Sequence, residues 1–176
     1  YSKLEGFAFL PVTCFAMALT TFISQNVGAQ KYDRVKKGAR FGMLCSMGMA
    51  EALGIIIALA SPVLMAMFDS TPDVVAFGAG RARICGYFFA FLAMSHCMAG
   101  IFRGAGRAMV PMIVMMACWC VLRVSYITMA LKVVNELTTV SWAYPITWTC
   151  SSIVFLIYFL KVDWMHGFEK AEKKIA

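Results

Sequence analysis

The sequence predicts an all-α polytopic membrane protein with five transmembrane helices. Three observations predict this fold class: 61% of the 176 residues are hydrophobic, only 14% are charged, and the mean hydropathy is +0.76. Soluble domains are about 45–50% apolar and about 25% charged. The composition excludes a disordered chain, a nucleic-acid-binding module and an ordinary cytosolic enzyme, although the net charge is +7. We expect the lipid bilayer, and no nucleic acid, as a partner.

Five long stretches carry at most one formal charge each. A transmembrane helix needs about 20 mainly apolar residues. The stretches do not alternate polar and apolar residues, as the strands of a membrane barrel do. In chain order, the predicted spans cover residues 6–26, 41–66, 84–102, 108–131 and 141–160. They form one domain, 1–161, which we interpret as part of a larger bundle, and a tail follows over 162–176.

The positions of Lys and Arg predict the orientation, because short cytoplasmic loops carry an excess of these residues. Five spans place the two ends of the chain on opposite sides of the membrane. One side carries eleven basic residues, within 31–40, 103–107 and 161–174, and the other side carries four. We therefore expect a cytoplasmic C-terminal tail in an integral membrane protein, which we assign to the bacterial inner membrane.

Two connecting segments carry their own signals. Residues 30–40 are basic and predict a short helix lying at the membrane interface. Residues 69–83 predict an outer loop in which Ser70 or Thr71 caps a helix start and Pro72 takes the first helical position.

Small residues recur at every fourth position around the second span. Because residues four apart share a helix face, they form one smooth stripe on which another helix can approach closely. This helix-packing stripe consists of Gly38, Gly42, Ser46, Ala50, Gly54 and Ala58. It is either a fixed packing seam or a seam that slides during a conformational cycle, and the sequence leaves both readings open.

Three ionisable residues lie within the spans: Glu51, His96 and Arg123. Charged groups in a bilayer are costly and normally face a partner or a water-filled cavity. At 1.5 Å per residue, Glu51 and His96 lie about 15 and 10 Å from the cytoplasmic edge, and Arg123 about 22 Å. A structural Glu51–Arg123 ion pair and a hydrogen-bonded core histidine are one interpretation. A proton or cation relay in a transport cavity is the other.

No enzyme constellation is present. The chain has only two histidines, no Ser/His/Asp order, no Walker loop and no paired acids in one span. Gly104-Ala105-Gly106 follows a predicted helix rather than a strand, so it is not a dinucleotide-binding turn. We predict no catalytic residue, no metal site and no cofactor.

Several segments carry a family resemblance by their order and spacing. The first runs from Ala18 to Ala29, contains Ser24-Gln25-Asn26-Val27-Gly28, and leads into Tyr32-Asp33-Arg34-Val35. The others are Met67-Phe68…Pro72-Asp73-Val74-Val75…Gly78, Phe102-Arg103-Gly104-Ala105-Gly106…Pro111, and the weaker Trp119…Arg123…Tyr126 and Trp142…Pro145-Ile146. By these segments the chain resembles the multidrug and toxic-compound extrusion (MATE) family of efflux transporters.

The resemblance implies a fold and a function. The five spans would be helices eight to twelve of a twelve-helix transporter made of two six-helix bundles, and the missing first bundle would be the partner within the same polypeptide. The family's activity would be the export of organic, mainly cationic, compounds by alternating access, coupled to entry of protons or sodium ions. The matching motif positions are Gln25, Asn26, Gly28, Arg103, Gly104, Gly106 and Pro111.

The sequence departs from the family at one ion-binding position. The sodium-coupled subgroup has an acid on the tenth helix, where this chain has Leu92. The resemblance therefore supplies no coupling residue here. A related lipid-linked oligosaccharide flippase, a membrane-embedded acyltransferase and a non-transporting scaffold are the alternatives, and the scarcity of intramembrane basic residues disfavours the flippase.

Overall fold

The structure is a computed structural model that describes residues 2–68, 71–133 and 137–165, and the regular structure of these residues is helical. The helices are α1 (Ser2–Gly28), α2 (Tyr32–Ala66), α3 (Pro72–Gly86), α4 (Phe89–Gly104), α5 (Met109–Met115), the π-helix η1 (Met116–Leu122), α6 (Arg123–Val133) and α7 (Leu137–Lys161).

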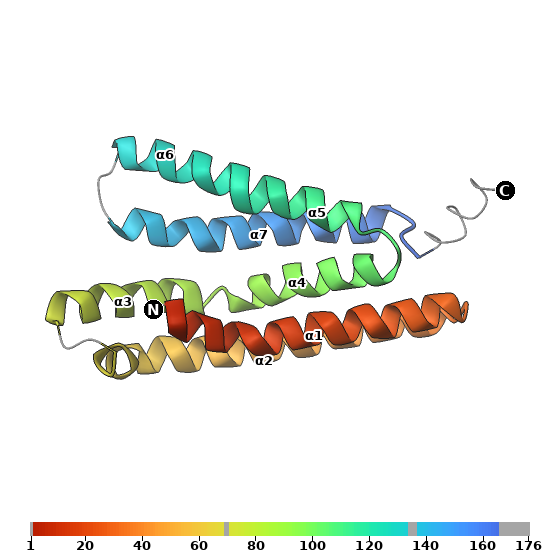
Figure 1. Cartoon of the computed structure of the whole chain (residues 1–176), viewed down its shortest axis with the longest axis horizontal. Helices are drawn as coiled ribbons and strands as arrows, with labels where there is room; N and C mark the ends of the chain where they lie inside the picture. The colour runs from red at the N-terminus through yellow and green to blue at the C-terminus, as the bar shows by residue number, and fades with distance from the viewer. Residues whose placement is uncertain (1, 69–70, 134–136, 166–176) are drawn as a thin grey trace.

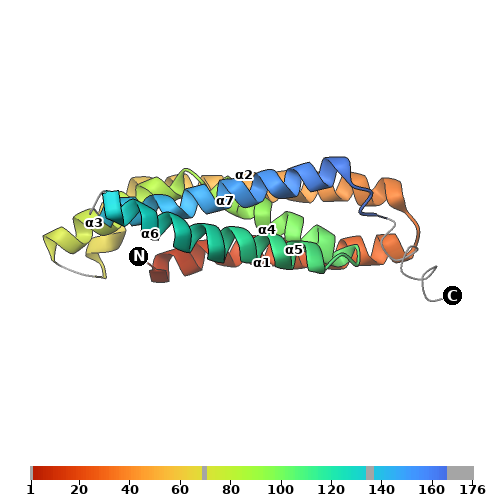
Figure 2. The ribbon, with the colours of Figure 1, turned by 90° about the horizontal axis from the view of Figure 1, so that it is seen from above.

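The helices run along one long axis, and the chain reverses direction after α1, α2, α4 and α6, whereas α3 continues into α4 and α5 continues through η1 into α6 (Figure 1). α2 packs on α1, α3 and α4, while α7 packs on α3, α4, η1 and α6. The α5–η1–α6 segment and the α1–α2 pair therefore lie on opposite sides of the α4–α7 layer in Figure 1, and Figure 2 shows the same bundle from above.

The described helices confirm the predicted membrane fold. Four segments are long and apolar enough to cross a bilayer: Leu4–Gly28, Tyr32–Ala66, Met109–Lys132 and Thr138–Lys161. A fifth span results when the bent pair α3–α4 is counted as one.

The third span differs from its predicted limits of 84–102. α3 and α4 are separated at Tyr87 and Phe88 and bent by 55°. Thr71 is the N-cap of α3 and Pro72 its first residue, as predicted, so most of the expected outer loop is helix. Hydropathy could not reveal the break, because the residues on both sides of it are apolar.

The basic stretch 30–40 is also different from the prediction. It is not a separate interfacial helix, because Tyr32 begins α2 and the helix continues unbroken for 35 residues. The reason is packing: Val35 and Ala39 are fully buried and carry the core stripe of α2 into the basic segment.

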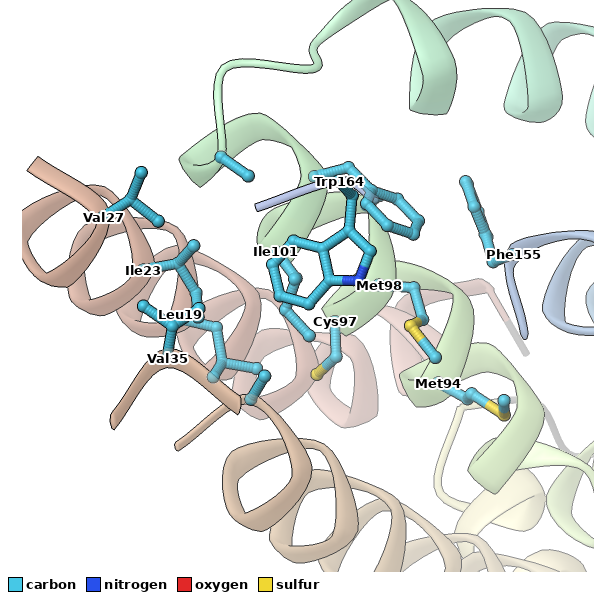
Figure 3. Packing of buried hydrophobic residues seen from close by; sticks show 14 residues of the cluster. Leu19, Ile23, Val27, Val35, Met94, Cys97, Met98, Ile101, Phe155 and Trp164 are labelled. Carbon is cyan, nitrogen blue, oxygen red and sulfur yellow. The ribbon is translucent and has the colours of Figure 1, made fainter. Parts of the chain in front are cut away.

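One hydrophobic core lies where α1, α2 and α4 meet the end of α7 (Figure 3). Ile23, Val35 and Met98 are buried there, and Trp164 is 3% exposed. The Trp164 ring stacks on Phe159 with 5.0 Å between centroids. The segment between Lys161 and Met165 is thus anchored over α4. Of the predicted tail, residues 166–176 lie outside the described part.

Candidate functional site

The helix-packing stripe of α2 faces two different helices. A Cβ atom at Gly42 would lie 2.6 Å from Leu19 of α1, and one at Gly38 would also strike an α1 side chain. Near the other end, a Cβ atom at Gly54 would strike the carbonyl oxygen of Gly86 in α3. The remaining members are buried: Ser46, Ala50 and Ala58. In this structure the stripe is a close-packed seam.

The first family-motif segment forms the turn that ends α1. The side-chain amide of Asn26 donates to the backbone carbonyl of Phe22, one turn earlier (2.7 Å), and the backbone carbonyl of Asn26 accepts from the N–H of Lys31 (2.9 Å). Gln25 and Gly28 occupy the last turn of the helix, and no neighbour lies within 4 Å of a Cβ built at Gly28. Asn26 therefore stabilises a chain reversal.

The motif segment from Phe102 to Pro111 forms the turn after α4 at the same end of the bundle. A Cβ atom on Gly104 would lie 2.5 Å from the carbonyl oxygen of Thr20, so only glycine allows α1 and α4 this close. Gly106 has a φ of 75°, which favours glycine. Pro111 is buried in α5, and Arg103 is exposed at the end of α4.

Glu51 interacts with the start of α4. Its Oε2 accepts a hydrogen bond from the backbone N–H of Ala90 (2.9 Å), across 39 residues of chain. α4 begins inside the span, and its N-cap residue Phe88 supplies no side-chain cap. The first N–H groups of a helix lack intrahelical partners and carry partial positive charge. The Glu51 carboxylate supplies the missing acceptor.

The predicted Glu51–Arg123 ion pair is wrong. Glu51 and Arg123 are both described and make no ion pair with each other. The physical reason is helix order: α2 packs on α1, α3 and α4, whereas α6 packs on α7 and η1. Similar depth in the membrane does not make two residues neighbours.

Arg123 is held by a hydroxyl and two aromatic rings. Its Nη2 donates to Oγ1 of Thr147 (2.7 Å), and its Cζ lies 4.4 Å from the ring centroid of Tyr144 and 5.3 Å from that of Trp119. Its buried Nε has no hydrogen-bond partner among the described residues. Arg123 directly follows η1, and π-helical turns occur frequently at functional sites.

A second arginine, which sequence reasoning placed in the outer loop, lies at the same tyrosine. The Cζ of Arg81 in α3 is 4.5 Å from the Tyr144 centroid, and its Nη2 lies 4.0 Å from Oε2 of Glu5. Both partners of this ion pair are about one-fifth exposed. We call Glu5, Arg81, Arg123, Tyr144 and Thr147 the arginine–tyrosine cluster. The predicted helix start at Pro72 was the signal that could have placed Arg81 on a helix instead of in a loop.

His96 lies between two aromatic rings. Its ring meets Phe9 edge-on at 4.7 Å and Trp119 at 5.3 Å, and its buried Nε2 has no hydrogen-bond partner among the described residues. The hydrogen-bonded core histidine that the sequence suggested is therefore not seen at this nitrogen. Trp119 itself donates to Oγ of Ser151 (3.3 Å).

Two of the three ionisable residues predicted inside the membrane lie against the same side chain. His96 and Arg123 both contact the indole of Trp119, and Glu51 makes its own separate contact at α4. In residues 2–68, 71–133 and 137–165, no group of three or more His, Cys, Asp or Glu side chains is arranged to hold a metal ion. The charges of Glu5, Arg81 and Arg123 gather at the arginine–tyrosine cluster.

Comparison with known proteins gives one family. The MatE family model matches residues 2–129. A protein of Thermotoga maritima named "Probable multidrug resistance protein NorM" is 30% identical over 112 residues, which cover 64% of this chain and 24% of that protein. "Probable multidrug resistance protein YpnP" of Bacillus subtilis is 25% identical over 121 residues, covering 69% of this chain and 27% of that protein.

A vertebrate relative shows the same similarity at lower identity. "Multidrug and toxin extrusion protein 1" of Danio rerio is 24% identical over 105 residues, which cover 60% of this chain and 18% of that protein. The chain therefore spans about a quarter or less of the length of these curated relatives. No solved structure matches.

Proposed function

Because this chain belongs to the MatE family of membrane transporters, we propose that it forms part of the C-terminal bundle of a multidrug efflux antiporter. The transporter exports organic, mainly cationic, compounds in exchange for protons or sodium ions. The rest of the polypeptide supplies the other bundle, and the basic end of this chain faces the bacterial cytoplasm. The observation that carries the proposal is the family match over residues 2–129, joined to relatives whose names all state multidrug or toxin handling.

The architecture supports a transporter better than a scaffold. Two arginines, a histidine and a carboxylate lie among the helices, where a purely structural bundle would favour apolar side chains. The third span is broken inside the apolar region, and irregular backbone at that depth is tolerated where it is covered by protein or lines a cavity. Both features are typical of proteins that move solutes through a bundle.

One observation favours a second candidate, the lipid-linked oligosaccharide flippase. The sequence counted Arg123 as the single intramembrane basic residue, but the structure places Arg81 on the same tyrosine ring. Two guanidinium groups suit a phosphate ligand. Glu5 offsets part of this charge, since it pairs with Arg81. The efflux function is therefore the stronger proposal.

The test is a transport assay on the full-length protein in liposomes. Ethidium serves as the cationic substrate, and a pH gradient, a sodium gradient or no gradient is imposed. We expect ethidium movement that requires one of the two gradients, with empty liposomes as the control. Gradient-independent flipping of a fluorescent pyrophosphate-linked lipid, without ethidium transport, would favour the flippase. If the protein shows neither ethidium transport nor lipid flipping, both proposals are contradicted.

A further inference from the structure

A basic pocket lies between the start of α2 and the end of α7. Its volume is about 350 Å³, and it is separate from the arginine–tyrosine cluster. Its polar side chains are Lys36 and Arg40 of α2, Lys161 at the end of α7, and Asp163. Apolar side chains complete the lining: Phe159, Leu160, Val162, Trp164 and Met165.

The three cations make the pocket an anion site. Lys36 and Arg40 are four residues apart, so they share one face of α2, and Lys161 approaches from the other helix. Each is exposed, and none forms an ion pair with a described residue. Asp163 offsets one of the three charges and leaves the pocket positive. Arg and Lys side chains in this arrangement suit a phosphate group, which Arg binds through two parallel hydrogen bonds.

The surfaces next to the pocket are apolar on the membrane side. Leu44, one turn beyond Arg40 on α2, is 63% exposed, and Ile157, one turn before Lys161 on α7, is 50% exposed. A ligand whose phosphate occupies the pocket would therefore have apolar helix faces beside the rest of its length. This combination fits an amphiphile better than a free phosphate ion.

The pocket is held in shape before any ligand arrives. Trp164 forms part of its wall and is buried against Phe159 and Phe102, at 5.0 and 6.1 Å between centroids. This packing fixes the short segment that follows Lys161. A wall that is already fixed does not have to be ordered when a ligand binds, so only the exposed Lys36, Arg40 and Lys161 side chains lose freedom on binding.

We propose that this pocket binds the phosphate headgroup of an anionic phospholipid of the surrounding leaflet. The location agrees with the chemistry, since basic pockets between transmembrane helices on the cytoplasmic side bind anionic headgroups. The pocket lies at the end of the bundle to which the Lys and Arg distribution assigns the cytoplasm. The inference does not depend on what the protein transports.

The test is lipid binding by the delipidated full-length protein, measured by native mass spectrometry. Dioleoyl phosphatidylglycerol is the anionic probe and dioleoyl phosphatidylcholine the neutral one. We expect the triple variant Lys36→Gln, Arg40→Gln, Lys161→Gln to bind phosphatidylglycerol at least tenfold more weakly than wild type. The matched control is Lys31→Gln, Arg34→Gln, Lys37→Gln, which removes three charges from the same region outside the pocket lining. It should bind within twofold of wild type.

Four outcomes would count against the proposal. Equal losses in the two triple variants would show general surface attraction rather than a site. Equal binding of the two lipids by wild type would remove the anionic preference. Displacement of phosphatidylglycerol by millimolar inorganic phosphate would assign the pocket to a soluble phosphate instead. Arg40→Lys keeps the net charge and tests the site without the risk of misfolding: we expect binding two- to fivefold weaker, and unchanged binding would argue against a phosphate held by the guanidinium.

Discussion

Removing the Glu51 carboxylate should weaken the membrane-embedded start of α4. The hydrogen bond from Ala90 to Glu51 is 2.9 Å long and joins a charged acceptor to a helix N-terminus. Hydrogen bonds to charged groups contribute about 1.5–3 kcal/mol, and the helix dipole adds up to about 2 kcal/mol in partly buried sites. These terms overlap, so we expect Glu51→Ala to lower the free energy of unfolding by about 2–3 kcal/mol.

Two further variants separate the contact at α4 from an ion pair. Glu51→Gln keeps a side-chain oxygen for Ala90 and loses only the charge, so the expected loss is about 1 kcal/mol. Because Glu51 and Arg123 do not touch, their effects should add to within about 0.5 kcal/mol in a double-mutant cycle. The measurement is reversible unfolding of the purified full-length protein in mixed micelles.

The reasoning fails under either of two results. Wild-type stability of Glu51→Ala would show that the Ala90 hydrogen bond contributes nothing measurable. A coupling energy above about 1.5 kcal/mol between Glu51→Gln and Arg123→Gln would restore the ion pair that the structure lacks. Efflux measurements on the same variants would report whether the start of α4 also matters for transport.

The other predictions concern packing, the tyrosine and the orientation. The Gly54→Leu variant should insert normally, but its free energy of unfolding should fall by about 1–3 kcal/mol or more and export should be lost, because the Gly86 carbonyl occupies the space. Gly48→Leu is the matched control, since no atom lies within 4 Å of a Cβ at Gly48. Equal export by the two variants would contradict the close-packed seam. Tyr144→Phe should retain most stability, whereas Tyr144→Leu should lose about 1–2 kcal/mol in micelle unfolding by removing both arginine–ring contacts; equal losses would argue against cation–π stabilisation. In a cysteine-free background, a membrane-impermeant thiol reagent added outside cells should label a cysteine at Ser70 and not one at Lys37, and the reverse pattern would invert the topology.

Periodicity predicted the features that depend on one helix at a time. Apolar stretches with at most one charge indicated the helices of four spans, and the four-residue spacing of Gly42 and Gly54 located the close-packed face of α2. Thr71 and Pro72 located the start of α3, chiefly because the fixed φ of proline suits the first turn of a helix.

Features that depend on the order of helices around the bundle could not be predicted in this way. Depth along the membrane axis suggested that Arg123 reaches Glu51, but α2 and α6 pack on different neighbours. The break at Tyr87 could not be predicted, because hydropathy is uniform across it. Without the break, the sequence could not indicate that α4 begins there with N–H groups that Glu51 contacts. Arg81 was counted with a loop because the end of α3 could not be placed.

The contacts of the acids bear on the proposed antiport. In the described spans, Glu5 lies 4.0 Å from Arg81, and Glu51 accepts from Ala90. By the resemblance, the acid of the sodium-coupled subgroup would lie at the position of Leu92, which is buried. To bind the coupling ion, Glu5 would first have to leave Arg81, or Glu51 would have to leave the start of α4. Arg123 contacts a hydroxyl and two aromatic rings and forms no ion pair with an acid among the described residues. For the proposed antiport we therefore expect proton or sodium coupling to use acids other than Glu5 and Glu51.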